Sequence, residues 1–182
     1  MAAQVEIVQV GTTVVYENRW MRVREDRVRR RDGSEGIYGI VEKPDFVVIA
    51  AGDGDEIHLV QQYRYPVRTR HWELPQGSWE TAPGTDIFVL AGAELAEETG
   101  LTAAEMEHAG RLLLASGYSN QGYNIFRARG LTRGSSSLET EEQDLVTRAF
   151  KISQLEDMIR HGEITDATTV ATFGLLRLRG ML

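Results

Sequence analysis

Short segments rich in β-branched residues, some with apolar and polar positions in alternation, occupy much of the first third of the chain and return after residue 110. A period of two residues is typical of β-strands, whose successive side chains point to opposite faces of a sheet. Asp32-Gly33 and Asp53-Gly54-Asp55 predict tight turns, and the second turn is expected to join a β-hairpin. The predicted strands cover residues 5–10, 12–16, 21–28, 46–50, 57–60, 111–115, 123–128 and 145–150.

Three other segments carry the start and stop signals of helices, and each is followed by a glycine that can end a helix. Thr85 or Asp86 can cap the N-terminus of the first one. Strands mixed with three helices, without a regular strand–helix repeat, predict an α+β fold rather than a doubly wound sheet. The predicted helices cover residues 86–99, 153–161 and 166–179, and the glycines are Gly100, Gly162 and Gly180.

Composition narrows the classes of protein that this chain can belong to. With 182 residues, of which 42% are hydrophobic, the chain can bury one sizeable core. Its net charge of −7 disfavours nucleic acid as a partner. The absence of cysteine excludes disulfides, cysteine-ligated zinc and a cysteine nucleophile, and it fits a reducing compartment. No signal peptide or membrane-spanning run is visible, so we expect a soluble cytoplasmic protein with no membrane partner.

The first predicted helix carries three carboxylates on one face. Glu94, Glu97 and Glu98 follow the i, i+3, i+4 spacing, and no Lys or Arg lies between Asp86 and Gly100. Like charges at this spacing repel by a few tenths of a kcal/mol per pair, and a hard divalent cation with oxygen ligands would remove that cost. A solvated acidic face is the alternative. Spacing alone leaves both interpretations open.

The segment from Glu94 to Leu101, with Gly77 upstream, resembles the Nudix box, G-x5-E-x7-R-E-U-x-E-E-x-G-U, in which U is an aliphatic residue. The end of the box matches at every specified position. The chain has two residues more than the pattern between Gly77 and Gly100, most simply an insertion within 78–82. With that placement Thr85 and Ala93 replace the first Glu and the Arg of the pattern, which support the helix in the family.

The resemblance extends to the ADP-ribose pyrophosphatases and other nucleotide-sugar Nudix enzymes. The segments 62–65 and 72–77 are similar to the stretch before the box in that subgroup, and Gly162 to Thr169 is similar to its C-terminal part. The loop 116–119 lacks the subgroup's usual proline. The resemblance implies a Nudix fold, with a mixed β-sheet core between helices. Residues 1–45 would form an N-terminal antiparallel β extension suited to dimerisation, and residues 46–182 the hydrolase domain.

By this resemblance the chain is a pyrophosphohydrolase that depends on Mg²⁺, or on Mn²⁺ as an alternative. Its reaction would convert a nucleoside diphosphate linked to another group, such as ADP-ribose or a similar nucleotide-sugar, into a nucleoside monophosphate and a sugar phosphate. A homodimer is implied as well. Two alternatives stay open: a Nudix hydrolase of dinucleoside polyphosphates, nucleoside triphosphates or oxidised nucleotides, and a non-catalytic sensor of nucleotide ligands.

The resemblance also assigns roles to residues. Glu94, Glu97 and Glu98 would hold the metal, with the carbonyl of Gln76 as a further ligand, and Glu94 and Glu98 would be catalytic. A loop after the box supplies another carboxylate in ADP-ribose pyrophosphatases. The candidates for it, as general base or extra ligand, are Glu139, Glu141 and Glu142. Glu141 or Glu142 is the choice among the three, and a solvated acidic loop stays open as the alternative.

Three substrate contacts are predicted outside the helix. Arg64 can bind a phosphate bidentately, with a surface salt bridge as the alternative. Glu73 matches a position that lines the pocket in the resembling enzymes, with pairing to a nearby arginine as the alternative. Trp20 could stack on a base or contribute to a subunit interface. His58 and His71 are expected to have ordinary structural roles.

Overall fold

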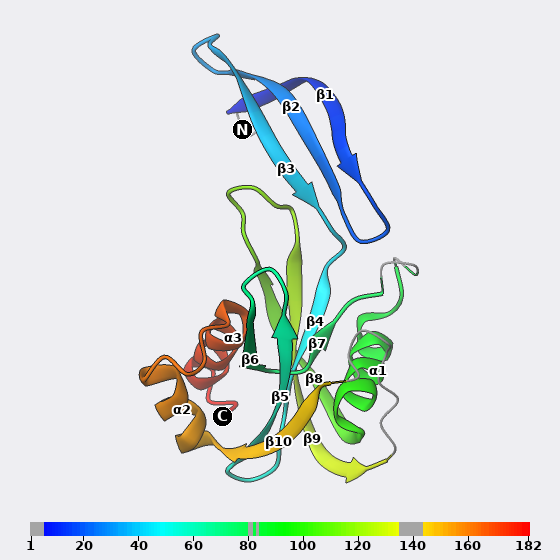
Figure 1. Cartoon of the computed structure of the whole chain (residues 1–182), viewed down its shortest axis with the longest axis vertical. Helices are drawn as coiled ribbons and strands as arrows, with labels where there is room; N and C mark the ends of the chain where they lie inside the picture. Colours follow the sequence, from blue (N-terminus) through cyan, green and yellow to red (C-terminus); the bar gives the residue numbers. More distant parts are fainter. Residues whose placement is uncertain (1–5, 80–81, 83, 135–143) are drawn as a thin grey trace.

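The computed structural model describes residues 6–79, 82, 84–134 and 144–182, and it distributes the strands among three sheets (Figure 1). The strands are β1 (Ile7–Glu17), β2 (Arg22–Arg30), β3 (Glu35–Glu42), β4 (Phe46–Ala51), β5 (Glu56–Arg64), β6 (Thr69–Glu73), β7 (Gln76–Gly77), β8 (Leu101–Leu113), β9 (Gly122–Arg133) and β10 (Val146–Lys151). The helices are α1 (Ile87–Thr99), α2 (Ile152–Arg160) and α3 (Ala167–Leu178).

The first sheet is an antiparallel extension, β1-β2-β3, that projects from the rest of the molecule (Figure 1). The two strands predicted at 5–10 and 12–16 are a single strand, because the pairing of β1 with β2 continues through two register shifts, between Gln9 and Gly11 and between Val14 and Tyr16. Bulges of this kind interrupt the alternation of side chains without ending the strand. The antiparallel N-terminal extension is thus confirmed.

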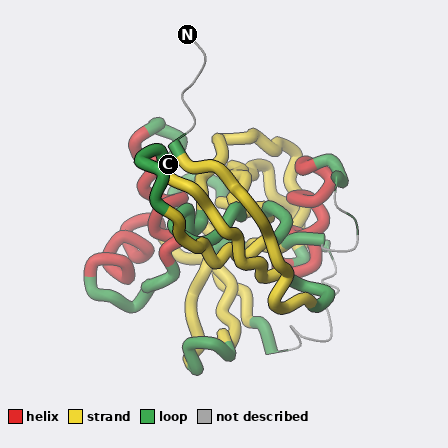
Figure 2. The backbone as a smooth tube through the Cα atoms, turned by 90° about the horizontal axis from the view of Figure 1, so that it is seen from above, coloured by secondary structure: helices red, strands yellow, loops and turns green. Residues whose placement is uncertain are grey.

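The second sheet, β7-β4-β9-β8, is mixed, because β4 runs parallel to β9 while its other pairs are antiparallel. Its central strand β4 is an apolar run since both of its faces are covered. Val47 and Ile49 pack on the side of α1, whereas Val48 and Ala50 pack on the side of α2 and α3. Helices therefore cover both sides of the sheets (Figures 1 and 2), which confirms the α+β fold with a sheet core between helices.

The hairpin predicted between residues 46–50 and 57–60 is wrong. The strand β5 pairs with β6 and β10 in a third sheet, not with β4. The carboxylate of Asp53, which follows β4, accepts hydrogen bonds from the backbone N–H groups of Gly130 and Leu131 at 2.8 and 2.9 Å. This turn is therefore fastened to β9, and the chain crosses from one sheet to the next.

The three predicted helices are confirmed within two residues at each end, and Gly100, Gly162 and Gly180 follow them with φ of 67°, 76° and 66°. The strand predicted at 111–115 begins ten residues earlier, at Leu101, as part of β8. Much of β8 is exposed, so no strong apolar alternation marks it; its long antiparallel pairing with β9 defines it instead. No helix in the described part of the chain is long and apolar enough to span a membrane.

Candidate active site

The acidic helix α1 is fixed by its caps and by its apolar face. The Asp86 carboxylate accepts hydrogen bonds from the backbone N–H groups of Phe88 and Val89, which satisfies donors that the first turn leaves open. Leu90 and Leu95 are buried against β4 and β9. The three glutamates follow in the C-terminal half of the same helix, so packing of the apolar residues fixes where the carboxylates lie.

Two of the three carboxylates are buried rather than solvated. Glu94 is 6% exposed and Glu98 is 1% exposed, while Glu97 is half-buried. The Glu98 carboxylate accepts a hydrogen bond from the backbone N–H of Gln76 at 2.9 Å, and its backbone carbonyl accepts one from the Thr147 hydroxyl at 2.9 Å. The interpretation as a solvated acidic face is therefore excluded for Glu94 and Glu98.

The strand β7 lies close against α1, and the position of closest approach is occupied by Gly77. A Cβ built on Gly77 would overlap the carboxylate of Glu94. A side chain at this position would push the carboxylate away or separate β7 from α1. The first glycine of the box pattern has a steric reason in this chain, because the backbone must approach the acidic helix closely.

The carboxylates fit a hard divalent cation in donor type, since all of them offer oxygen ligands. Glu94 and Glu97 line a cavity, and Glu98 lies behind them against Gln76. In the described parts of the chain, no three His, Cys, Asp or Glu side chains converge as a ready-made metal cluster. The ligand set of Glu94, Glu97, Glu98 and the Gln76 carbonyl stays a prediction, supported by donor chemistry and burial.

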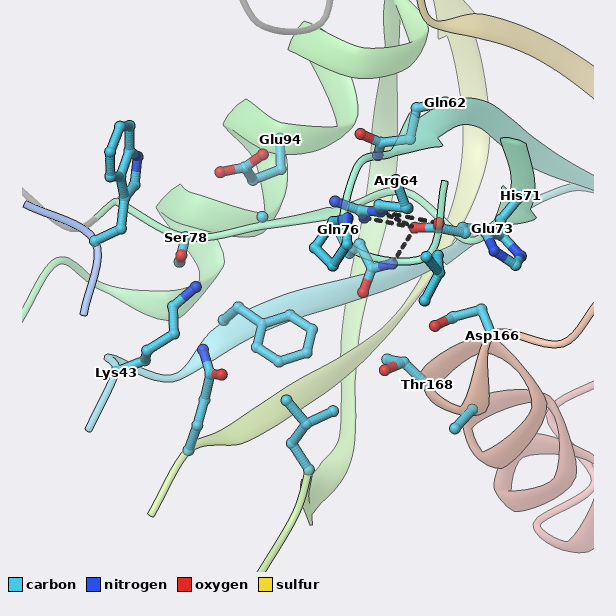
Figure 3. Close-up of a pocket in the computed structure, with 18 of the residues that line it drawn as sticks. Lys43, Gln62, Arg64, His71, Glu73, Gln76, Ser78, Glu94, Asp166 and Thr168 are labelled. Carbon is cyan, nitrogen blue, oxygen red and sulfur yellow. Dashed lines mark hydrogen bonds and ion pairs between the residues drawn. The ribbon is translucent and has the colours of Figure 1, made fainter. Parts of the chain in front are cut away.

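A cavity of about 1060 Å³ lies between α1, the β5–β6 hairpin, the start of α3 and the turn that follows β1 (Figure 3). Its walls combine acidic, cationic, amide and aromatic side chains. The lining residues are Trp20, Lys43, Phe46, Gln62, Arg64, Pro66, Val67, Thr69, His71, Glu73, Gln76, Gly77, Ser78, Trp79, Glu94, Glu97, Leu114, Gln121, Thr165, Asp166, Ala167 and Thr168.

Arg64 and Glu73, both predicted to contact substrate, form an ion pair on one wall of the cavity (Figure 3). The Arg64 Nε lies 3.0 Å from the Glu73 Oε1, and its Nη2 lies 2.5 Å from Oε2, to which the Gln76 side-chain amide also donates at 2.7 Å. Burial favours a lower pKa for Arg64, but its hydrogen bonds and attraction to Glu73, with the charges of Glu98 and Asp166, leave its pKa raised. Both residues thus line the cavity, as a substrate contact requires. They also form an ion pair with each other, which was the alternative interpretation of each residue.

The start of α3 closes the neighbouring wall. Asp166 caps this helix by accepting the backbone N–H of Thr169 at 2.7 Å, and the Thr169 hydroxyl accepts the backbone N–H of Leu74 at 3.0 Å. The His71 ring lies 3.3 Å from the Thr165 hydroxyl. Residues 162–169 and 72–77, two separate segments of the resemblance, are therefore adjacent in space. It also places His71 in the cavity wall, a position that its sequence context did not indicate.

Trp20 lies in a turn at the edge of the same cavity. The Asn18 side-chain oxygen accepts the backbone N–H groups of Trp20 and Met21, both at 2.9 Å, and the Arg19 guanidinium lies 3.9 Å from the centre of the indole ring. The residue is 42% exposed. Stacking of its ring on a planar group in the cavity stays a prediction.

Several cavity residues carried no sequence signal. Lys43, Phe46 and Gln121 come from connections and strands far apart in the chain, so no motif joins them. The loop 116–119 is joined to the end of β3, because the Ser119 hydroxyl donates to the carbonyl of Val41 at 2.8 Å. The predicted base candidates Glu139, Glu141 and Glu142 lie outside the described residues.

A helix of buried carboxylates, packed on a mixed sheet and facing a large polar cavity, is the arrangement that the resemblance to the Nudix family implies. Comparison with known proteins agrees. The model of the nucleoside diphosphate sugar hydrolase N-terminal domain matches residues 8–41. An ADP-ribose pyrophosphatase of Mycobacterium tuberculosis (strain ATCC 25618 / H37Rv) is 29% identical over 164 residues, covering 89% of this chain and 79% of that protein.

A second ADP-ribose pyrophosphatase, from Bacillus subtilis (strain 168), is 29% identical over 172 residues, covering 92% of this chain and 91% of that protein. The crystal structure of an ADP compounds hydrolase matches the fold with a TM-score of 0.86 at 20% identity, covering 100% of this chain and 98% of that one. The chain therefore resembles the ADP-ribose pyrophosphatases in sequence and shares its fold with an ADP compounds hydrolase.

Proposed function

We propose that the protein hydrolyses the pyrophosphate bond of a nucleoside diphosphate joined to a sugar, with ADP-ribose as the leading substrate. The products would be a nucleoside monophosphate and a sugar phosphate. The observation that carries the proposal is that one cavity of about 1060 Å³ has Glu94 and Glu97 on one wall and Arg64 and Trp20 on others. Its volume suits a ligand of nucleotide-sugar size. The names of the relatives support the same substrate class.

Glu94, Glu97 and Glu98, with the carbonyl of Gln76, would hold Mg²⁺ in this proposal. Bound Mg²⁺ neutralises negative charge on a pyrophosphate and makes water a better nucleophile at neutral pH. Burial of Glu94 and Glu98 strengthens their attraction for a cation, because water screens them less than it would at the surface. Glu141 or Glu142 remains the proposed general base.

The other walls would bind and orient the substrate. The ion pair with Glu73 uses the Nε and Nη2 of Arg64, and it directs the guanidinium along one wall of the cavity, where the Nη1 edge can donate to a phosphate oxygen. Trp20 would stack on the base. Fixed donors and a stacking surface hold the reacting phosphorus in a constant position relative to the acidic helix, which lowers the entropic part of the barrier.

A homodimer is part of the proposal because the N-terminal sheet exposes apolar side chains that a second copy of the chain could cover. A three-stranded sheet with so much exposed apolar surface is unfavourable in water. The exposed apolar side chains of this sheet are Ile7, Val8, Val10, Val14, Val15, Tyr16, Ile37 and Tyr38. Sedimentation at micromolar concentration should give twice the chain mass; a monomer would contradict this part of the proposal. We also propose a cytoplasmic location, which the lack of cysteine favours.

The decisive experiment incubates the protein with Mg²⁺ and a panel of ADP-ribose, other nucleotide-sugars, dinucleoside polyphosphates and nucleoside triphosphates. Release of AMP from ADP-ribose is the expected result. Preference for a dinucleoside polyphosphate or a triphosphate would replace the substrate, and tight binding without turnover of any compound would favour a sensor.

Matched variants locate the reaction. Glu98→Gln should lower turnover at least about a hundredfold, because a neutral amide would replace a charged carboxylate among the proposed Mg²⁺ ligands. Glu107→Gln removes an exposed carboxylate paired with Arg129 on β9, outside the cavity, and should leave turnover unchanged. Equal activity of both variants would show that α1 is not the catalytic helix.

A further inference from the structure

The described walls of the cavity contain two permanently charged cations, Arg64 and Lys43, in different electrostatic situations. Arg64 is bound bidentately by Glu73, so much of its charge is already compensated. Lys43 is half-buried, and no ion pair or hydrogen bond joins its ammonium to any described residue. An ammonium that lines a cavity without a counter-charge among the described residues can pair with an anionic ligand there.

Figure 3 shows the two cations in different parts of the cavity. Arg64 lies with Glu73 and Gln76, whereas Lys43 comes from the connection between β3 and β4 and points toward Ser78. Lys43 also shares a smaller surface pocket with Trp20. An anion bound between the acidic helix α1 and the Trp20 indole ring would therefore lie near the ammonium of Lys43.

The backbone that carries Lys43 is held firmly on both sides. On one side, the backbone N–H of Val41 donates to the carbonyl of Tyr118 at 2.8 Å. On the other, the side-chain amide of Gln121 donates to the carbonyl of Pro44 at 2.7 Å. A long side chain on a fixed backbone can follow a phosphate oxygen at little cost, because only its own rotamers are restricted on binding.

We propose that Lys43 binds a phosphate of the substrate at the nucleoside side of the pyrophosphate and is, among the described side chains of the cavity, the main source of uncompensated positive charge for that purpose. This proposal rests on the proposed function, because it assumes a nucleoside diphosphate in the cavity. The ammonium has three donors and no acceptor, so it recognises oxyanions and contributes little to an uncharged nucleoside.

Equilibrium binding separates a phosphate contact from a general effect on the cavity. The probes are α,β-methylene-ADP, whose bridging carbon prevents hydrolysis, and adenosine, both measured by calorimetry with Mg²⁺. Lys43→Met should weaken α,β-methylene-ADP about ten- to a hundredfold, as loss of one charge-assisted hydrogen bond does, and should leave adenosine affinity unchanged. Lys43→Arg should restore most of the loss. Equal affinity of wild type and Lys43→Met for the diphosphate would overturn the proposal, and so would an equal loss for adenosine.

The chain offers an internal control, because Lys43 and Lys151 are its only lysines. Lys151 pairs with Asp55 at 3.0 Å on the end of β10, outside the cavity. Amine-selective acetylation followed by mass spectrometry should show that α,β-methylene-ADP at ten times its dissociation constant slows modification of Lys43 about tenfold by mass action. Modification of Lys151 should be unaffected. Equal rates at Lys43 with and without the diphosphate would count against the contact.

The two proposals can fail separately. If wild type releases AMP from ADP-ribose while Lys43→Met binds the diphosphate and turns over as wild type does, the proposed function stands and the role of Lys43 is wrong. If wild type neither hydrolyses the panel nor binds α,β-methylene-ADP, the proposed function itself fails. Lys151→Met serves as the matched variant and should retain both affinities.

Discussion

Replacing Arg64 with Met would remove one partner of the ion pair in the cavity wall and leave the Glu73 carboxylate with the Gln76 amide as its remaining side-chain partner. The Glu73 side chain is only 3% exposed, so its charge cannot return to water without disrupting the wall. Breaking a fully buried pair in this way costs about 3–5 kcal/mol. Because the Arg64 side chain is 40% exposed, part of its attraction is screened, and we expect a loss of about 2–3 kcal/mol after that discount.

Urea unfolding and thermal melting would measure this loss. For a chain of this length, 2–3 kcal/mol corresponds to a fall in Tm of roughly 4–12 °C. Arg70→Met is the matched control, because Arg70 pairs with the exposed carboxylate of Asp144 at 2.5 Å, and surface pairs contribute about 0–1 kcal/mol.

A second variant tests the cause rather than the size of the effect. Adding Glu73→Leu to Arg64→Met removes the stranded charge, so the double variant should recover stability relative to Arg64→Met alone. If Arg64→Met and Arg70→Met lose equal stability, or if the double variant is less stable than Arg64→Met, the buried carboxylate is not the reason for the loss.

Three further predictions concern the helix and the sheets. Gly77→Ala should lower turnover at least about tenfold by displacing the Glu94 carboxylate. Gly117→Ala, whose added Cβ meets nothing within 4 Å, should leave turnover unchanged. Equal turnover of the two variants would contradict the steric argument. Asp86→Ala should reduce the free energy of unfolding by about 1 kcal/mol in urea titration because the first turn of α1 loses its cap. Burial lowers the pKa of His58, so the neutral ring stabilises the fold fully above about pH 6.5, and this contribution is lost as the pH falls through the lowered pKa. His58→Gln should therefore lose less stability than wild type between pH 7.5 and 5.5, as measured by urea unfolding at both values.

The acidic helix could be predicted from the sequence because its determinants lie within about one helical segment. The cap at Asp86, the glycine at 100 and the i, i+3, i+4 spacing of the glutamates all act over a few residues. The α+β class followed from the same kind of local pattern. From the sequence, Gly77 could be assigned only by its match to the motif. The structure gives the reason for a glycine there: its backbone lies against the carboxylate of Glu94, 17 positions further along the chain.

What only the tertiary structure decided is which elements become neighbours. The sequence of the turn at Asp53 was consistent with a hairpin. In the structure, the Asp53 carboxylate accepts hydrogen bonds from Gly130 and Leu131 of β9, and β5 lies in a different sheet from β4. The position of Lys43 in the cavity wall, and of His71 beside Thr165, likewise depends on long-range packing. Local hydrogen bonding and periodicity predicted the three helices and several of the strands. The walls of the site arise where several elements meet, and that meeting depends on burial of apolar faces that no short segment can specify alone.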